Sequence, residues 1–271
     1  MKNAAVLGSP IQHSLSPLIH AAAYRKLGFE ASYVACEVTS DGLRDFLASK
    51  LSQSEWIGFS LTMPLKEKVC EIAADLGIVA NPQALQISSA NTLYREGDQW
   101  RATSTDVTGF SFLLGSQEFE GATIFGAGGT ARAAIEALDP QIPITIVSRS
   151  EKRESEIRIA FPHRNFRFVS WSGAARAWNN QLVVVAVPIS AIAELATTFT
   201  APEFLVDVLY SPWIPPLTRM QMEAGKSAVT GIDLLCAQAL GQIRLMTGST
   251  FDDHELFDYL KRIAENHLSH N

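Results

Sequence analysis

Short apolar runs alternate along this chain with stretches in which apolar residues recur every three or four positions. Short runs bounded by turn residues predict buried strands, and the three-to-four spacing predicts amphipathic helices. In the first part of the chain, strands are predicted at 4–7, 32–38 and 57–61, and helices at 17–27, 41–49 and 66–76. Alternation of strands and helices predicts a largely parallel sheet covered by helices.

A second series of strands and helices begins at Gly121. Before it, strands predicted at 87–94 and 100–103 flank the turn residues 96–98, and a helix is predicted after Asp106. After it, strands are predicted at 122–125, 144–147, 182–187 and 204–208, and helices at 130–138, 151–160, 232–246 and 255–267. Two α/β domains are therefore expected, one formed by residues 1–106 and one by residues 107–237, with residues 238–271 packing back onto the first.

Composition narrows the class of protein. The 271 residues are 47% hydrophobic and 18% charged, as in soluble globular enzymes. The net charge of −6 gives no basic patch for nucleic acid or an anionic membrane, and no apolar stretch is long enough to span a bilayer. The chain start lacks a signal peptide, and the odd count of three dispersed cysteines favours reduced thiols, so a cytoplasmic protein is expected. The six histidines include no His-x-x-x-His pair, and no bound metal is expected.

The segment after the strand at 122–125 has the spacing Gly126-x-Gly128-x-x-Ala131. It matches the dinucleotide fingerprint, in which the first glycine permits a tight turn and the second lets the backbone approach a pyrophosphate. The third position must be small so that the helix packs on the strand. Glycine turns also cap ordinary strand–helix units, but the position between a strand and a helix favours a cofactor site. The expected site consists of Gly126, Ala127, Gly128, Gly129, Thr130 and Ala131.

The residues after the next strand suggest which dinucleotide is bound. An acidic residue there would favour NAD, because it accepts from the ribose 2′-hydroxyl. This chain instead has Ser148-Arg149-Ser150, with Arg153 one turn further on. Arginines at a helix start are disfavoured by the helix dipole unless an anion neutralises them, so Arg149 and Arg153 favour the 2′-phosphate of NADP. Glu151 weakens that preference, and a solvated basic helix start is the alternative.

Lys66 occupies an unusual position at the start of a predicted helix, directly after the strand at 57–61. The helix dipole disfavours a cation there by about 0.3–1 kcal/mol. A solvated lysine is the default interpretation. A catalytic role requires a carboxylate partner and a substrate site beside it.

Seven blocks of the sequence, in order, resemble the shikimate dehydrogenase family over nearly the whole chain. They are residues 8–20 (GSPIQHSLSPLIH), 61–66 (LTMPLK), 89–92 (SANT), 104–106 (STD), 126–129 (GAGG), 207–212 (DVLYSP) and 231–238 (GIDLLCAQ). The resemblance implies an oxidoreductase that reduces 3-dehydroshikimate with NADPH in chorismate and aromatic amino-acid biosynthesis. It also implies an N-terminal substrate domain with a mostly parallel sheet, a Rossmann-type NADP-binding domain and a cleft between them, with a homodimer as one option.

The resemblance also assigns residues. Lys66 matches the catalytic lysine, and Asp106 its partner carboxylate; capping the helix after it is the competing role for Asp106. Ser14 and Ser16 match hydroxyls that bind the substrate carboxylate, although Ser16 is equally suited to cap the helix at 17–27. His20 is expected to be a packed structural side chain. The remaining expected substrate contacts are Ser60, Thr62, Asn91, Tyr210 and Gln238, and the remaining cofactor contacts are Val187 and Gly231.

Three positions depart from the family pattern. Ser60 and Ser104 replace asparagines, and Val187-Pro188 replaces the usual Thr-Pro or Thr-Ser near the nicotinamide. Because Ser60 is shorter than asparagine, the substrate pocket is expected to differ there, and quinate is the alternative alcohol to test. One competing function is a quinate/shikimate dehydrogenase that accepts NAD. The other is a non-catalytic ligand-sensing homologue, which the Lys66–Asp106 pair disfavours because sensing does not need a proton donor.

Overall fold

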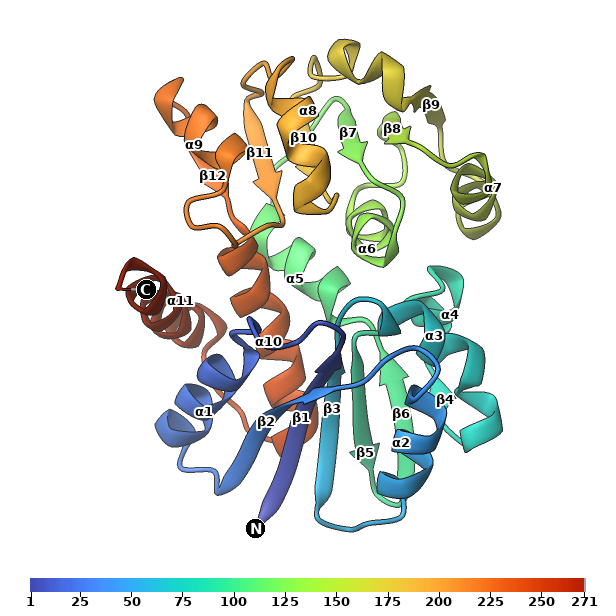
Figure 1. Ribbon diagram of the computed structural model, residues 1–271, viewed down its shortest axis with the longest axis vertical. Helices are drawn as coiled ribbons and strands as arrows, with labels where there is room; N and C mark the ends of the chain where they lie inside the picture. The colour runs from blue at the N-terminus through green and yellow to red at the C-terminus, as the bar shows by residue number, and fades with distance from the viewer. Residues whose placement is uncertain (271) are drawn as a thin grey trace. The chain divides into compact units, whose positions relative to one another are not determined.

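The computed structural model describes residues 1–270, which form two compact units. One unit contains Met1–Gly109 and the segment from Leu235 to the end of the described chain, and the other contains Phe110–Leu234. The chain thus leaves the first unit and returns to it, so that the red C-terminal helices accompany the blue N-terminal ones in Figure 1.

The first unit is built on a six-stranded mixed sheet. Its order is β2 (Ala31–Glu37), β1 (Lys2–Gly8), β3 (Trp56–Leu61), β5 (Thr92–Glu96), β6 (Gln99–Thr103) and β4 (Val79–Ala80). Only β5 runs antiparallel to its neighbours, through the hairpin that it forms with β6. The expected mostly parallel sheet is confirmed.

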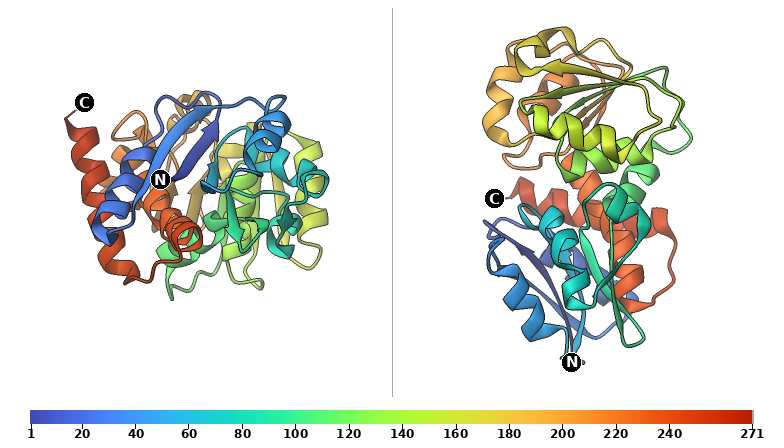
Figure 2. Two further views of the ribbon diagram at one scale, coloured as in Figure 1. Left: turned by 90° about the horizontal axis from the view of Figure 1, so that it is seen from below. Right: turned by 90° about the vertical axis from the view of Figure 1, so that its right-hand side faces the viewer.

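Helices cover both faces of this sheet (Figure 2). The helices of the unit are α1 (Ser16–Leu27), α2 (Leu43–Lys50), α3 (Leu65–Ile72), the 3₁₀ turn η1 (Ala74–Leu76), α4 (Pro82–Gln86), the start of α5 (Thr105–Leu114), most of α10 (Gly231–Thr247) and α11 (Asp253–Ser269). Phe59 and Leu61 of β3 pack into one apolar cluster with α2 and α3. Gly58 and Ser60 point to the opposite face, where Met246 of α10 lies directly against Gly58.

The second unit contains a fully parallel six-stranded sheet. Its order is β12 (Ala228–Val229), β11 (Phe204–Asp207), β10 (Leu182–Val185), β7 (Ala122–Phe125), β8 (Ile144–Ser148) and β9 (Phe166–Ser170). Counted within the unit, this is the order 6-5-4-1-2-3 of the Rossmann fold, which reverses between β7 and β10. Its helices are α6 (Gly129–Ala137), α7 (Glu151–Ala160), η2 (Trp171–Arg176), η3 (Ile189–Ala191), α8 (Ile192–Ala196) and α9 (Pro216–Glu223).

Two sequence-based predictions were wrong in ways that matter for the site. The strand predicted at 87–94 begins only at Thr92, because the backbone N–H groups of residues 87–89 donate back to carbonyls of α4 and close its C-terminal end. Ser16 does not cap α1: it lies inside the helix, the cap position is Leu15, and no side chain bonds there. Within residues 1–270, the helices are too short or too polar to cross a membrane.

Candidate active site

Lys66 lies in the first turn of α3, where the chain turns after β3. Its Nζ lies 2.6 Å from Oδ2 of Asp106, in the first turn of α5. The lysine side chain is 18% exposed and the aspartate side chain 3%, so the pair is shielded on the carboxylate side and open on the ammonium side. Because α5 begins at Thr105, Asp106 lies inside the helix, and its carboxylate is used by Lys66 rather than as a cap.

Asn91, fully buried just before β5, holds the other oxygen of this carboxylate. Its Nδ2 donates to Oδ1 of Asp106 at 2.9 Å and to Oε1 of Gln238 at 2.6 Å. Its Oδ1 accepts from the backbone N–H of Thr105 at 2.7 Å. One buried amide therefore links α10 to the charged pair and holds Oδ1 of Asp106, while Lys66 holds Oδ2.

Two further side chains extend this group, and the sequence analysis had given neither a role in the site. Gln242 Nε2 donates to Gln238 Oε1 at 3.1 Å, and Gln242 Oε1 lies 3.0 Å from His20 Nε2. Burial lowers the pKa of His20 to about 4, so that the ring is neutral at physiological pH. The spacing i, i+4 between Gln238 and Gln242 on a helix is the signal that places both on one face.

Ser60 is buried on the face of β3 that α10 covers, and its Oγ accepts a hydrogen bond from the Tyr33 hydroxyl at 2.7 Å. The Tyr33 ring stacks on His20 with 3.9 Å between ring centroids. Burial raises the pKa of Tyr33, which keeps the phenol protonated as the donor. The shorter side chain noted at Ser60 is therefore matched by a tyrosine hydroxyl that reaches it.

The remaining expected substrate contacts of the first unit follow β1 and β3 at the edge of the sheet that carries Lys66. Ser14 Oγ accepts from the backbone N–H of Ser16 at 3.3 Å, and Ser16 is buried at the start of α1. Thr62 lies against Gly8, which has no side chain to displace it. The two serines are thus joined to each other, and Lys66, Asp106, Asn91 and Gln238 form one bonded group.

In the second unit, the glycine turn has the geometry that a dinucleotide needs. Gly126 has φ +111°, and a Cβ there would lie 2.3 Å from the backbone oxygen of Ala186, so only glycine fits. A Cβ at Gly128 would meet no atom within 4 Å, which leaves the backbone open to a ligand. Gly129 and Thr130 begin α6, and Ala131 is fully buried. Open backbone at a helix N-terminus fits a pyrophosphate.

The segment after β8 lines a cavity of about 440 Å³. Ser148, Arg149 and Ser150 lie on it, and Ser150 caps α7 by accepting from the backbone N–H of Arg153. Arg149 lies over the ring of Trp171, 4.3 Å from its centroid, and its Nη2 is 3.2 Å from Oε2 of Glu194. Trp171 Nε1 donates to the same carboxylate at 2.6 Å.

Arg153, the second arginine expected at the 2′-phosphate, is 2.9 Å from Glu156. Both arginines of the sequence-predicted site are thus already paired with carboxylates. The i, i+3 spacing of Arg153 and Glu156 on α7 is visible in the sequence, but the Arg149 pair is not, because Glu194 is 45 residues away.

The other expected residues of this unit follow β10 and β11. Val187, which is buried, lies 3.4 Å from the position of a Cβ at Gly126, and Gly231 approaches the backbone of Val208 and Leu209 too closely for any side chain. Tyr210 follows the buried Asp207, which accepts from the backbone N–H of Leu209 at 3.2 Å and from the Thr218 hydroxyl at 3.2 Å. Burial raises the pKa of Asp207 to about 6 and also raises that of Tyr210.

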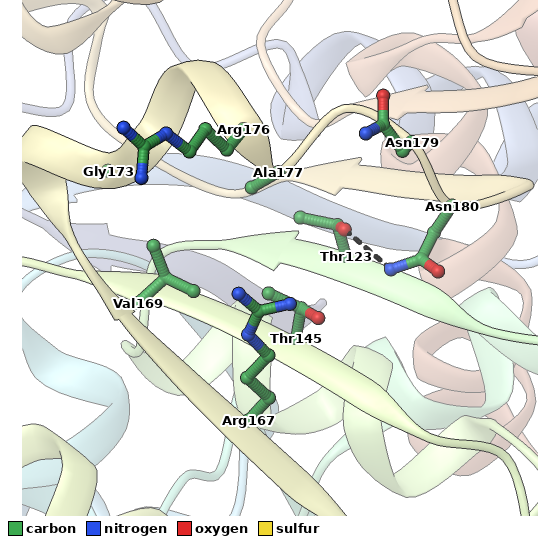
Figure 3. A pocket seen from close by; sticks show the side chains of 9 residues that line it. All are labelled: Thr123, Thr145, Arg167, Val169, Gly173, Arg176, Ala177, Asn179 and Asn180. Atoms are coloured by element: carbon green, nitrogen blue, oxygen red, sulfur yellow. Dashed lines mark hydrogen bonds between the residues drawn. The ribbon is translucent and has the colours of Figure 1, made fainter.

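A separate cavity of about 240 Å³ lies over β7, β8 and β9 (Figure 3). Its floor contains Thr123, Thr145 and Arg167, which occupy matching positions of the three strands. None of its nine lining residues is one of the sequence-predicted site residues. We therefore treat it as distinct from the dinucleotide turn.

Comparison with known proteins supports the resemblance seen in the sequence. Residues 6–93 match the family model of the shikimate dehydrogenase substrate binding domain. The shikimate dehydrogenase (NADP(+)) of Salinibacter ruber is 30% identical, over 94% of this chain and 95% of that protein. The corresponding protein of Rhizobium etli is 33% identical, over 87% of this chain and 86% of its own.

Solved structures agree with the fold. The crystal structure of Mycobacterium tuberculosis shikimate dehydrogenase superposes with a TM-score of 0.85 at 32% identity, covering 97% of this chain and 100% of that one. The Thermus thermophilus enzyme, in complex with NADP(H) and shikimate, gives a TM-score of 0.79 at 28% identity with the same coverage. The chain belongs to the shikimate dehydrogenase family.

Proposed function

We propose that the protein interconverts 3-dehydroshikimate and shikimate with NADP(H), and that Lys66 and Asp106 assist the proton transfer. The observation that carries this proposal is the Lys66–Asp106 pair at 2.6 Å, joined to Asn91 and Gln238. A ligand-sensing protein would not need a proton donor held in this way. The names of the relatives in Salinibacter and Rhizobium supply the reaction and the cofactor.

The chain's own residues suggest how the chemistry proceeds. NADPH, when bound, supplies the hydride that reduces the ketone. Negative charge then develops on the carbonyl oxygen, and an ammonium group beside it stabilises that charge and donates the proton. Asp106, held through both carboxylate oxygens, orients the Lys66 ammonium and balances its charge. Asn91 keeps the carboxylate in place, so the lysine needs little reorganisation in the transition state.

The proposed binding roles follow the same division. In the first unit, Ser14 and Ser16 bind the substrate carboxylate, and Thr62, Gln238 and Ser60 bind its hydroxyls; Tyr210 of the second unit is proposed as a further donor. The turn from Gly126 to Ala131, together with Ser148–Ser150, Arg153, Val187 and Gly231, binds NADP. The open backbone at Gly128 and the N-terminus of α6 support the pyrophosphate position.

The decisive experiment is a steady-state assay of shikimate oxidation with NADP and with NAD, using the wild type and the variants Lys66→Ala and Lys68→Ala. Lys68 lies on the same helix and pairs with the exposed Glu71 at 2.8 Å, which makes it a matched control. We expect kcat to fall by about 10²-fold or more in Lys66→Ala, the range for acid–base catalysis, and to stay unchanged in Lys68→Ala. Full activity of Lys66→Ala would remove the lysine from the mechanism.

The same assay with quinate tests the alternative alcohol, which Ser60 favours because its side chain is shorter than asparagine. Turnover of quinate would extend the activity to both alcohols. Absence of quinate turnover at any concentration would refute tolerance of quinate.

We also propose that the protein works in the cytoplasm and forms a homodimer. Cys36, Cys70 and Cys236 form no disulfide within residues 1–270, which fits a reducing compartment. Light scattering at micromolar concentration tests the dimer, and a mass of 29.6 kDa would refute it.

A further inference from the structure

The directions of the hydrogen bonds around Asn91 are fixed by the backbone. The N–H of Thr105 can only donate, so the atom of Asn91 that faces it at 2.7 Å is the oxygen. The amide nitrogen therefore donates both of its hydrogens, one to Asp106 and one to Oε1 of Gln238 at 2.6 Å. The orientation of the Gln238 amide follows, because the group that accepts from Asn91 must be its oxygen.

The same reasoning continues to His20. Gln238 Oε1 can only accept, so the Gln242 atom 3.1 Å from it is the amide nitrogen. This nitrogen also lies 3.4 Å from the Thr92 hydroxyl. The oxygen of Gln242 then faces His20 Nε2 at 3.0 Å, and that ring nitrogen must carry the proton.

His20 is suited to hold this single arrangement. Its side chain is fully buried and stacked on Tyr33, and burial lowers its pKa to about 4, so the ring stays neutral at working pH. Its Nδ1 is buried with no hydrogen-bond partner among residues 1–270. In the Nδ1–H tautomer, the buried Nδ1–H would have no acceptor and the Gln242 oxygen would lose its donor. In the Nε2–H tautomer, only Nδ1 remains as an acceptor without a donor, which costs less free energy.

The consequence appears at Gln238, whose side chain is only partly buried. Its oxygen is filled by Asn91 and Gln242, and its NH₂ has no acceptor among the described residues. This residue therefore offers donors, and no acceptor, to a ligand beside Lys66 and Asp106.

We propose that His20 and Gln242 are positioning residues for the reaction, which hold the Gln238 amide so that its NH₂ donates to an oxygen of the substrate. The inference rests on the proposed function, since it takes the substrate to be the polyol acid that lies beside Lys66. It also specifies the direction of the hydrogen bond. The substrate hydroxyl oxygen accepts from the Gln238 NH₂, and the hydroxyl proton is donated to a group other than Gln238.

The test compares Gln242→Leu, which removes the side-chain hydrogen bonds to His20, Gln238, Thr92 and the Asn91 backbone oxygen at similar volume, with Met246→Leu, one turn along α10 and packed against Gly58. We expect Gln242→Leu to raise the KM for shikimate by about 10-fold, the effect of one hydrogen bond, with kcat within about twofold and the KM for NADP unchanged. Met246→Leu should leave all three constants unchanged. Should Gln242→Leu fold poorly, His20→Phe keeps the stack on Tyr33 and removes the donor to Gln242.

A double-mutant cycle shows whether Gln242 acts through Gln238. The double variant Gln238→Ala/Gln242→Leu is expected to have the same KM as Gln238→Ala alone, because the positioned group is gone. If the two effects multiply, Gln242 does not act through Gln238 and the proposal is overturned.

A measurement without substrate separates this inference from the proposed function. Nitrogen-15 NMR of the wild-type histidine rings should show His20 as the neutral Nε2–H tautomer from pH 6 to 9. An Nδ1–H tautomer would overturn the inference even in an active enzyme, and a protein with the expected tautomer but no shikimate oxidation would contradict the proposed function alone.

Discussion

Asp207 allows a prediction whose size and sign follow from one buried carboxyl group. It ends β11, is 0% exposed, and has its pKa raised from 3.8 to about 6 because burial removes the water that stabilises its charge. Hydrogen bonds from Leu209 and Thr218 oppose this effect without cancelling it. Asp207→Asn removes the charge and keeps an oxygen that accepts from one of these donors.

The magnitude follows from linkage between protonation and folding. Each pH unit between the two pKa values corresponds to about 1.36 kcal/mol, so the ionised carboxylate costs the folded state about 3 kcal/mol. The folded protein holds the proton more tightly than the unfolded chain does. Stability from this group is therefore fully present below about pH 4, falls as the pH rises through about 6, and is constant above it. Relative to the wild type, Asp207→Asn should gain up to about 3 kcal/mol between pH 4 and pH 7.5.

Native-state hydrogen exchange of the β10 and β11 amides measures the free energy of opening of this unit in both proteins. Carbon-13 NMR of the Asp207 carboxyl group gives its pKa directly. A titration near 4, or a stability difference between the two proteins that does not change with pH, would refute the reasoning. Since Asp207 also holds the backbone that leads to Tyr210, the KM for shikimate in the variant shows whether that turn has moved.

Two further predictions concern the second unit. Glu194→Gln removes the carboxylate that pairs with Arg149. Because exposed ion pairs contribute up to about 1 kcal/mol, the ratio of kcat/KM with NADP to kcat/KM with NAD should rise by up to about fivefold. An unchanged or lower ratio would show that Glu194 does not compete with the 2′-phosphate for Arg149. Gly126→Ala places a Cβ 2.3 Å from the backbone oxygen of Ala186, just after β10, and should lower the melting temperature of the protein as well as NADP binding. In Gly128→Ala the new Cβ meets no protein atom within 4 Å, so this variant should bind NADP more weakly in calorimetry but keep the wild-type melting temperature. Equal melting temperatures for Gly126→Ala and Gly128→Ala would contradict the difference expected between the two glycines.

The sequence predicted the elements where local signals were strong. The strand at 122–125 and the helix at 151–160 begin and end as predicted, because each is bounded by clear turn or capping residues. The short helix α9 and the edge strands β9 and β12 were not predicted. In β9 the alternation Phe166-Arg167-Phe168 is a strand signal over only three residues, and β12 consists of only two residues. Their place depends on packing against the rest of the sheet.

The site was predictable only as far as the motifs reach. The family blocks pointed to Lys66, Asp106, Asn91 and Gln238, and the structure joins these four residues by hydrogen bonds. The Arg149–Glu194 pair depends on a contact between distant parts of the chain. It cannot be inferred from periodicity or from spacing along one element, and for that reason the competition for Arg149 becomes apparent only in three dimensions.

The return of the chain at Leu235 has a consequence for biosynthesis. Asn91 and Gln238 are 147 residues apart, and the segment between them contains the whole second unit. During synthesis on the ribosome, the first unit therefore lacks α10 until the second unit has been made. The Lys66–Asp106 pair lacks Gln238 for the same time. Gly109 and Gly241 let α5 and α10 approach each other closely, because side chains there would meet Gln238 and Thr105 at about 3.0 Å. If the inserted unit folds first, it shortens the loop that must be closed, and the last helices to be synthesised then complete the site.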